Sequence, residues 1–131
     1  MTLPLNASPS VLVAEDDEHI SHLLQFMLSR EKYVVHLARD GRDAKQYIEN
    51  NDPPDIVLLD VMLPFVDGFA LVSLLRVQPA WKHTPVIMLT AKTQEQHIVR
   101  ALNAGANDYV TKPFQPVELM ARIKRLSMRR A

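Results

Sequence analysis

Five short apolar runs, rich in β-branched residues, alternate along this chain with longer segments whose apolar residues recur at helical spacing. The runs cover residues 11–14, 33–37, 56–59, 86–89 and 109–111. Strands of a parallel sheet have this almost continuous apolar character, because helices cover both faces of the sheet. The alternation therefore predicts five βα units built around a buried parallel sheet.

The segments between the runs predict five helices, because their apolar residues follow the i, i+3, i+4 spacing of one helix face. Pro79 ends the third helix, Gly105 caps the fourth and Pro116 suits the first turn of the fifth. We predict a doubly wound α/β fold with the flavodoxin-like strand order 2-1-3-4-5 and five helices. The second run contains His36 and is the least apolar, which favours an edge position. The helical stripes are Ile20, Leu23, Leu24, Met27 and Leu28; Ala44, Tyr47 and Ile48; Phe69, Val72 and Leu75; Ile98, Ala101 and Leu102; and Val117, Met120, Ala121 and Ile123.

The composition excludes several classes of protein. The chain has 131 residues, enough for one domain, and a formal net charge of zero, which argues against a nucleic-acid footprint over the whole domain. It has no cysteine, which excludes disulfides and thiolate metal sites. No apolar run approaches the roughly 18 residues of a membrane span, so we expect no membrane contact. We expect a flexible N-terminal lead-in over residues 1–10, one domain over 11–129, and the C-terminal end or the start of a linker at 130–131.

Polar side chains follow four of the five predicted strands at their carboxyl ends. In an open α/β sheet, ligands bind outside this edge, where the strand order reverses. An acidic residue after a strand is often only the N-cap of the next helix, and this alternative applies to Asp16 and Asp17 taken singly. The coincidence of four strands at one edge favours a functional site instead. Its members are Glu15, Asp16 and Asp17 after the first strand, Asp60 after the third, Thr90 after the fourth, and Lys112 after the fifth.

These residue types indicate a metal-assisted phosphoryl acceptor. Crowded carboxylates repel one another unless a cation offsets the repulsion, and an all-oxygen set favours Mg²⁺. A carboxylate such as Asp60 can attack phosphorus. The transferring group also needs a cation and a hydroxyl donor, which Lys112 and Thr90 can supply.

The stretches VLVAEDDEHI, DIVLLDVMLPFVDG, PVIMLTA and GANDYVTKPF resemble the receiver domains of two-component response regulators, and the chain is most similar to the class attached to winged-helix DNA-binding domains. The resemblance implies the CheY-like form of the predicted fold and a cis Lys112–Pro113 bond. It also implies a role for each site residue: Asp60 is the phosphoacceptor, Lys112 contacts the phosphoryl group, Thr90 and Tyr109 form the switch, and Glu15, Asp16, Asp60 and the backbone carbonyl of Met62 bind Mg²⁺.

The family's mechanism then follows as an expectation. A histidine kinase or phosphotransfer protein donates the phosphoryl group, and the domain catalyses only its own phosphorylation and dephosphorylation. Phosphorylation reshapes the face made by the fourth helix, the fifth strand and the fifth helix, and thereby controls an output, for which we expect transcription, in the cytoplasm. Met62 and Lys92 occupy the family's two lifetime-tuning positions. Met62 offers no group to position a hydrolytic water, which predicts slow autodephosphorylation.

Residues that match a dimer face in this class are Asp108, Glu118, Arg122 and Arg129. Ile98 and Asn107 depart from the pattern, because an ionic partner is usual at both positions, and this weakens the expected homodimer. The basic end, ARIKRLSMRRA, carries no interleaved aromatic residues, so we expect no direct nucleic-acid binding by this segment.

Three other functions are open to such a sheet. The domain could act alone in a phosphorelay, through protein–protein interaction. A flavodoxin-like cofactor binder would need a phosphate-cradling loop after the first strand, but the acidic residues 15–18 would repel phosphate. An aspartyl phosphatase would need a second acid close to Asp60 and a substrate cap, and residues 61–68 offer only Asp67, seven positions further on, and no cap.

Overall fold

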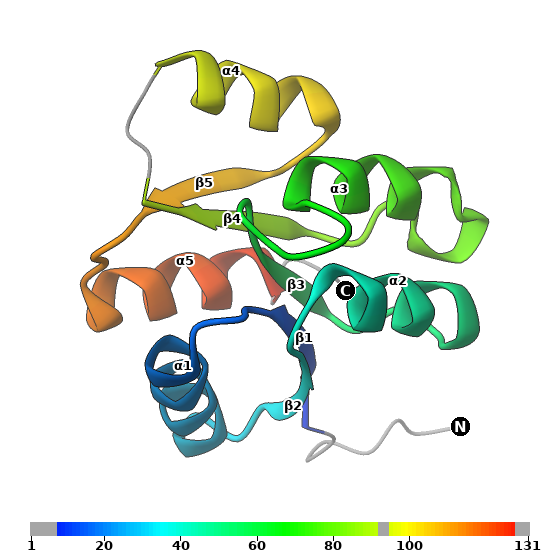
Figure 1. The fold of residues 1–131 in the computed structure, drawn as a ribbon. Helices are drawn as coiled ribbons and strands as arrows, with labels where there is room; N and C mark the ends of the chain where they lie inside the picture. Colours follow the sequence, from blue (N-terminus) through cyan, green and yellow to red (C-terminus); the bar gives the residue numbers. More distant parts are fainter. Residues whose placement is uncertain (1–7, 92–94, 128–131) are drawn as a thin grey trace, which may run out of the picture.

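Five parallel strands and five α-helices alternate in the computed structural model, which describes residues 8–91 and 95–127 (Figure 1). Within those residues no helix is both long and apolar enough to cross a membrane. The elements are β1 (Ser10–Ala14), α1 (Glu18–Arg30), β2 (Val34–Ala38), α2 (Gly41–Asn50), β3 (Ile56–Asp60), α3 (Gly68–Val77), the 3₁₀ turn η1 (Pro79–Trp81), β4 (Val86–Thr90), α4 (Glu95–Ala104), β5 (Asp108–Thr111) and α5 (Pro116–Ser127).

The sheet has the order β2-β1-β3-β4-β5, and every neighbouring pair is parallel, which confirms the predicted topology. β2 lies at an edge, as its lower apolar content predicted. β1 begins at Ser10, one residue before the predicted run, because Ser10 pairs with Val34 of β2, and the Ser10 N–H also donates to the Asp55 carboxylate at 2.7 Å. Residues 1–7 of the predicted lead-in lie outside the described part of the chain.

Side chains alternate along the central strands between two separate cores. Leu12, Val57 and Met88 belong to one core, and their neighbours Val13, Leu58 and Ile87 belong to the other. α2, α3 and α4 cover the first face of the sheet, and α1 and α5 cover the second (Figure 1). This two-sided burial explains why the strands are almost continuously apolar in the sequence.

The ends of the helices follow the sequence signals. Asp17 caps α1, because its carboxylate accepts the N–H groups of His19 and Ile20. Gly105 ends α4 with a φ of 108°, and the N–H of Ala106 donates to the Ala101 carbonyl at 3.0 Å. This is the glycine C-cap that the sequence predicted, in the Schellman form.

Arg76 joins α3 to two loops at the amino end of the sheet. Its guanidinium donates to the carbonyl oxygens of Thr84 at 2.6 Å and Gly105 at 2.8 Å, and to Oδ1 of Asn107 at 3.0 Å. The same Asn107 oxygen accepts the N–H of Val86 at 2.9 Å. Asn107 therefore has a role inside the fold that the dimer-face comparison did not reveal.

Candidate functional site

The carboxyl ends of β1, β3, β4 and β5 bring the predicted site residues to one edge of the sheet. The register pairs Ala14 with Leu59, Asp60 with Leu89, and Thr90 with Thr111. The residues that directly follow these strands therefore lie close to one another at the carboxyl edge of the sheet. Asp60 is the last residue of β3 and is only 5% exposed.

Lys112 joins the two buried carboxylates of the site. Its Nζ lies 2.6 Å from Oε1 of Glu15 and 3.0 Å from Oδ2 of Asp60. The Lys112 N–H donates to the Thr90 carbonyl at 2.7 Å, which fixes the start of the loop after β5. The sequence predicted that Lys112 would lie near Asp60, but not that its shorter ion pair would be with Glu15.

Burial and charge act against each other at this ion pair. Burial raises the pKa of Glu15 to about 7, although the hydrogen bond from Lys112 and the Asp17 N–H oppose the shift. For Lys112, burial would lower the pKa, but the hydrogen bonds to Glu15 and Asp60 outweigh it, and the net pKa is raised. Lys112 therefore stays positively charged and offsets part of the carboxylate charge.

Asp16 and Asp17 have different roles. Asp17 is the N-cap of α1, so the interpretation of this residue as a helix cap is confirmed. Asp16 is exposed, and its carboxylate forms a group with those of Glu15 and Asp60, in which one oxygen of each lies within 4.8 Å of the others. The three carboxylates form an all-oxygen donor set, and the one ammonium nearby offsets only part of their negative charge. This set fits a hard divalent cation such as Mg²⁺.

The loop after β3 also contacts the phosphoacceptor candidate. The N–H of Met62 donates to Oδ1 of Asp60 at 3.1 Å, while the Met62 side chain is 63% exposed. Gly68 packs against the end of β3 so closely that a Cβ there would lie 2.4 Å from the Asp60 backbone oxygen. Sequence reasoning missed Gly68, although an Asp-Gly pair just after the acceptor loop is a recognisable signal for a capped helix start.

Thr90 and Tyr109 lie next to each other, as the predicted switch pair requires. Thr90 is fully buried at the end of β4, and Tyr109 is half-buried on β5. Burial raises the pKa of Tyr109, and a hydrogen bond with Thr90 opposes that shift. The Lys112–Pro113 peptide bond is cis, as predicted.

The predicted dimer-face residues pair within the chain. Arg122 lies 2.9 Å from Asp108 and 3.0 Å from Glu118, measured between guanidinium nitrogens and carboxylate oxygens. Arg129 and Lys92 lie outside the described residues. Among the described residues, the charges that were expected to face a partner, Asp108, Glu118 and Arg122, are therefore engaged with one another inside one molecule.

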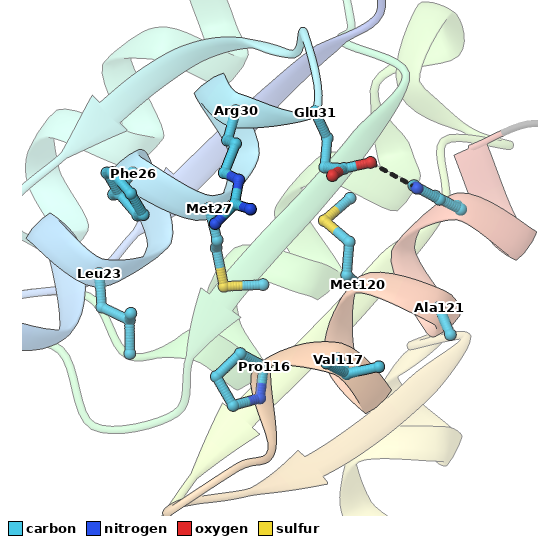
Figure 2. Close-up of a pocket in the computed structure, with 10 residues that line it drawn as sticks. Leu23, Phe26, Met27, Arg30, Glu31, Pro116, Val117, Met120 and Ala121 are labelled. Atoms are coloured by element: carbon cyan, nitrogen blue, oxygen red, sulfur yellow. Dashed lines mark ion pairs between the residues drawn. The ribbon is translucent and has the colours of Figure 1, made fainter.

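A separate apolar groove lies between α1 and α5 (Figure 2). Leu23 and Phe26 from α1 and Val117 and Met120 from α5 are among the residues that line it. Glu31 is the one carboxylate in its lining, and it forms an ion pair with Lys124 across the groove. The cluster of Glu15, Asp16 and Asp60 lies outside this groove, so the candidate site is the acidic edge of the sheet.

The fold and the acidic pocket define an α/β domain of the CheY-like class. The sequence profile of the response regulator receiver domain matches residues 11–124. The chain therefore belongs to this family and is the receiver domain of a two-component response regulator.

Curated relatives of the chain are transcriptional regulators. It is 44% identical over 119 residues to the alkaline phosphatase synthesis transcriptional regulatory protein PhoP of Bacillus subtilis, covering 91% of this chain and 48% of that protein. It is 43% identical over 123 residues to the phosphate regulon transcriptional regulatory protein PhoB of Rhizobium meliloti, covering 94% of this chain and 53% of that protein. The chain thus spans about half the length of these relatives.

Solved receiver domains have the same fold. The receiver domain of the Francisella response regulator 1452 superposes with a TM-score of 0.87 at 35% identity, covering 95% of this chain and 100% of that chain. The receiver domain of the sensor histidine kinase PA1611 from Pseudomonas aeruginosa gives a TM-score of 0.85 at 32% identity, covering 93% and 99%, and that structure has a magnesium ion in its active-site cleft.

Proposed function

We propose that this receiver domain accepts a phosphoryl group on Asp60 with the help of Mg²⁺. The observation that carries the proposal is the buried Asp60 carboxylate, whose two oxygens have different partners. Oδ2 accepts from Lys112 and Oδ1 accepts from the N–H of Met62. The neighbouring carboxylates of Glu15 and Asp16 complete an oxygen set that suits a divalent cation.

The transfer follows from these contacts. An Asp60 oxygen attacks the phosphorus of a phosphohistidine, the O–P bond forms as the N–P bond breaks, and the imidazole keeps the electron pair. When bound, Mg²⁺ neutralises charge on the phosphoryl oxygens, and Glu15, Asp16, Asp60 and the Met62 carbonyl would hold it. Lys112 supplies a fixed positive charge at the same oxygens. In this scheme the domain assists only its own phosphorylation and dephosphorylation.

The switch that we propose begins at Thr90. Its hydroxyl moves toward the new phosphoryl group, and Tyr109 follows because the two side chains are hydrogen-bonded. Tyr109 lies on β5 between α4 and α5, so the movement alters the face of α4, β5 and α5. The phosphoryl group thereby biases an equilibrium between two conformations.

Receiver domains interact with histidine kinases or phosphotransfer proteins, and we propose such a protein as the phosphodonor. Since the matched relatives are transcriptional regulators, we propose transcription as the output and the cytoplasm as the location. The proposed domain extends over 11–129. A homodimer through α4, β5 and α5 would be weak, because Arg122 already pairs with Asp108 and Glu118 and because Ile98 and Asn107 provide no ionic partner.

Removal of the metal tests the proposed chemistry. Incubation with acetyl phosphate and Mg²⁺ is expected to add one phosphoryl group to the protein, because the cation offsets repulsion between the donor and the acidic pocket. The same incubation with a chelator is expected to give almost no product. Intact-protein mass spectrometry measures both results. Equal phosphorylation with and without the chelator would contradict the role of Mg²⁺.

Replacement of Met62 by asparagine tests the predicted lifetime of the phosphoryl group. The exposed Met62 side chain has no polar group, whereas an amide at this position can orient a water toward the phosphorus. We expect Met62→Asn to lose its phosphoryl group about tenfold faster, which is less than the roughly 10²- to 10⁴-fold contribution of general acid–base catalysis, because the amide only orients the water. The measurement is the decay of the phosphorylated species after the donor is removed, with Met62→Leu as the matched control. Equal decay in Met62→Asn and Met62→Leu would show that this side chain does not set the lifetime.

A further inference from the structure

Phe65 in the loop between β3 and α3 has an unusual backbone conformation. Its φ is 73°, in the left-handed region, and its side chain is 67% exposed. A bulky residue without a glycine's freedom rarely adopts this φ, because its Cβ crowds the backbone. Such a conformation persists only when contacts around it hold it in place.

The first turn of α2 provides those contacts. The guanidinium carbon of Arg42 lies 3.7 Å from the centroid of the Phe65 ring, a cation–π contact. The N–H of Gly41 donates to the Pro64 carbonyl at 2.9 Å. The approach is so close that a Cβ on Gly41 would lie 1.9 Å from the Val66 backbone oxygen. α2 therefore contacts the loop backbone on both sides of Phe65.

This loop between β3 and α3 directly follows Asp60. It begins with Val61, which accepts the N–H of Gly68 at 3.0 Å, and with Met62, whose N–H donates to the Asp60 carboxylate at 3.1 Å. The loop is thus tied to the acceptor strand at one end and to α2 at Phe65. The peptide group that carries the Met62 carbonyl lies between these two ties, and its own N–H, on Leu63, donates to the Val61 carbonyl at 3.3 Å.

We propose that Arg42 and Phe65 form a clip that holds this loop so that the Met62 carbonyl is available to the divalent cation. Both are positioning residues, because neither belongs to the group of carboxylates that could hold the cation. The inference rests on the proposed function, in which Mg²⁺ is held at this edge of the sheet. It assigns to the exposed Arg42–Phe65 pair an effect on Mg²⁺ affinity that surface side chains do not usually have.

The direction in which Arg42→Ala changes the Mg²⁺ affinity distinguishes the positioning role of the clip from a purely electrostatic effect of the Arg42 charge. Removing a positive charge near an acidic site should strengthen the binding of a cation. If the clip positions the carbonyl, Arg42→Ala should instead weaken Mg²⁺ binding by about threefold to tenfold, below the 10- to 100-fold common for directly bonded outer-shell partners. Lys45→Ala removes an exposed positive charge from the same helix and is the matched control, with unchanged or slightly tighter binding expected.

The experiment is a titration of the full chain with Mg²⁺, followed by the backbone amide resonances of the site in NMR spectra. Phe65→Leu keeps a branched side chain at the strained φ but removes the ring, and it should weaken binding to the same degree as Arg42→Ala. The double variant should bind no more weakly than either single variant, because both remove one shared contact. Thermal unfolding of each variant separates an effect on affinity from a loss of the fold.

Asp16→Asn distinguishes failure of the clip from failure of the proposed function. If Asp16→Asn binds Mg²⁺ as the wild type does, the metal site itself is wrong. If Asp16→Asn loses binding while Arg42→Ala and Phe65→Leu keep the wild-type affinity, the site stands and the clip is overturned. The clip is also overturned if the effects of Arg42→Ala and Phe65→Leu add in the double variant. Should Arg42→Ala not fold, Phe65→Leu alone decides by the same criterion.

Discussion

Asp60→Asn is expected to abolish phosphorylation by acetyl phosphate and Mg²⁺. The amide has nearly the same shape as the carboxylate, and its single oxygen can still accept one of the two hydrogen bonds, from Lys112 or from the Met62 N–H. It carries no negative charge, however, and is a far weaker nucleophile toward phosphorus. The fold should therefore persist while the chemistry is lost. Intact-protein mass spectrometry should show no added phosphoryl group.

Asp52→Asn is the matched control for this prediction. Asp52 is exposed between α2 and β3, and it belongs neither to the acidic pocket nor to a helix cap. The control variant should be phosphorylated to the wild-type extent. Peptide mapping locates the modified residue in both proteins. Phosphorylation of Asp60→Asn at the wild-type level would mean that another residue is the acceptor, and the proposed function would be wrong in its central point.

Arg76→Ala is expected to lower the free energy of unfolding by about 3 kcal/mol. Hydrogen bonds that involve a charged group contribute about 1.5–3 kcal/mol each, and a buried acceptor left without a donor adds a further cost. Arg76 donates to the carbonyl oxygens of Thr84 and Gly105 and to the side chain of Asn107. The truncation removes these bonds together, so it should loosen the connection between α3, β4 and β5.

Thermal and urea denaturation measure this loss. A change of this size in a domain of this length corresponds to a fall in melting temperature of about 10 °C. Arg76→Lys should recover only part of the stability, because an ammonium cannot reproduce the planar fork that reaches several carbonyls. Arg39→Ala, at an exposed position, should change the free energy of unfolding by less than about 0.5 kcal/mol. Equal stabilities of Arg76→Ala and Arg39→Ala would contradict the assigned role.

The sequence was sufficient for the topology because the fold depends on a repeated pattern. Strands that are apolar on both faces must be covered on both faces, and short βα connections leave one chirality for each crossover. Strand ends then fall at one edge, so Asp60 and Lys112 were predicted to lie together from their places in the chain. Their contact at 3.0 Å agrees with that prediction.

The partners of individual charges could not be read from the sequence in the same way. Glu15, Asp16 and Asp17 are adjacent and chemically alike, yet their partners differ. Glu15 pairs with Lys112, the Asp16 carboxylate lies near those of Glu15 and Asp60, and Asp17 caps α1. The direction of each side chain depends on backbone angles at the end of β1 and on where α1 begins. Asn107 is a similar case, since its bonds to Arg76 and Val86 join segments far apart in the chain.

The sequence by itself determined the alternation of strands and helices, the end of α4 at Gly105 and the edge of the sheet at which Asp60 lies, because these follow from periodicity, capping and the direction of parallel strands. Only the tertiary structure decided which groups touch Asp60: Lys112 at one carboxylate oxygen and the Met62 N–H at the other. It alone revealed that α2 holds the loop after β3 through Arg42 and Phe65. The physical reason is that hydrogen bonds and ring contacts act over a few ångströms, and only the packing of distant segments brings their partners within that range.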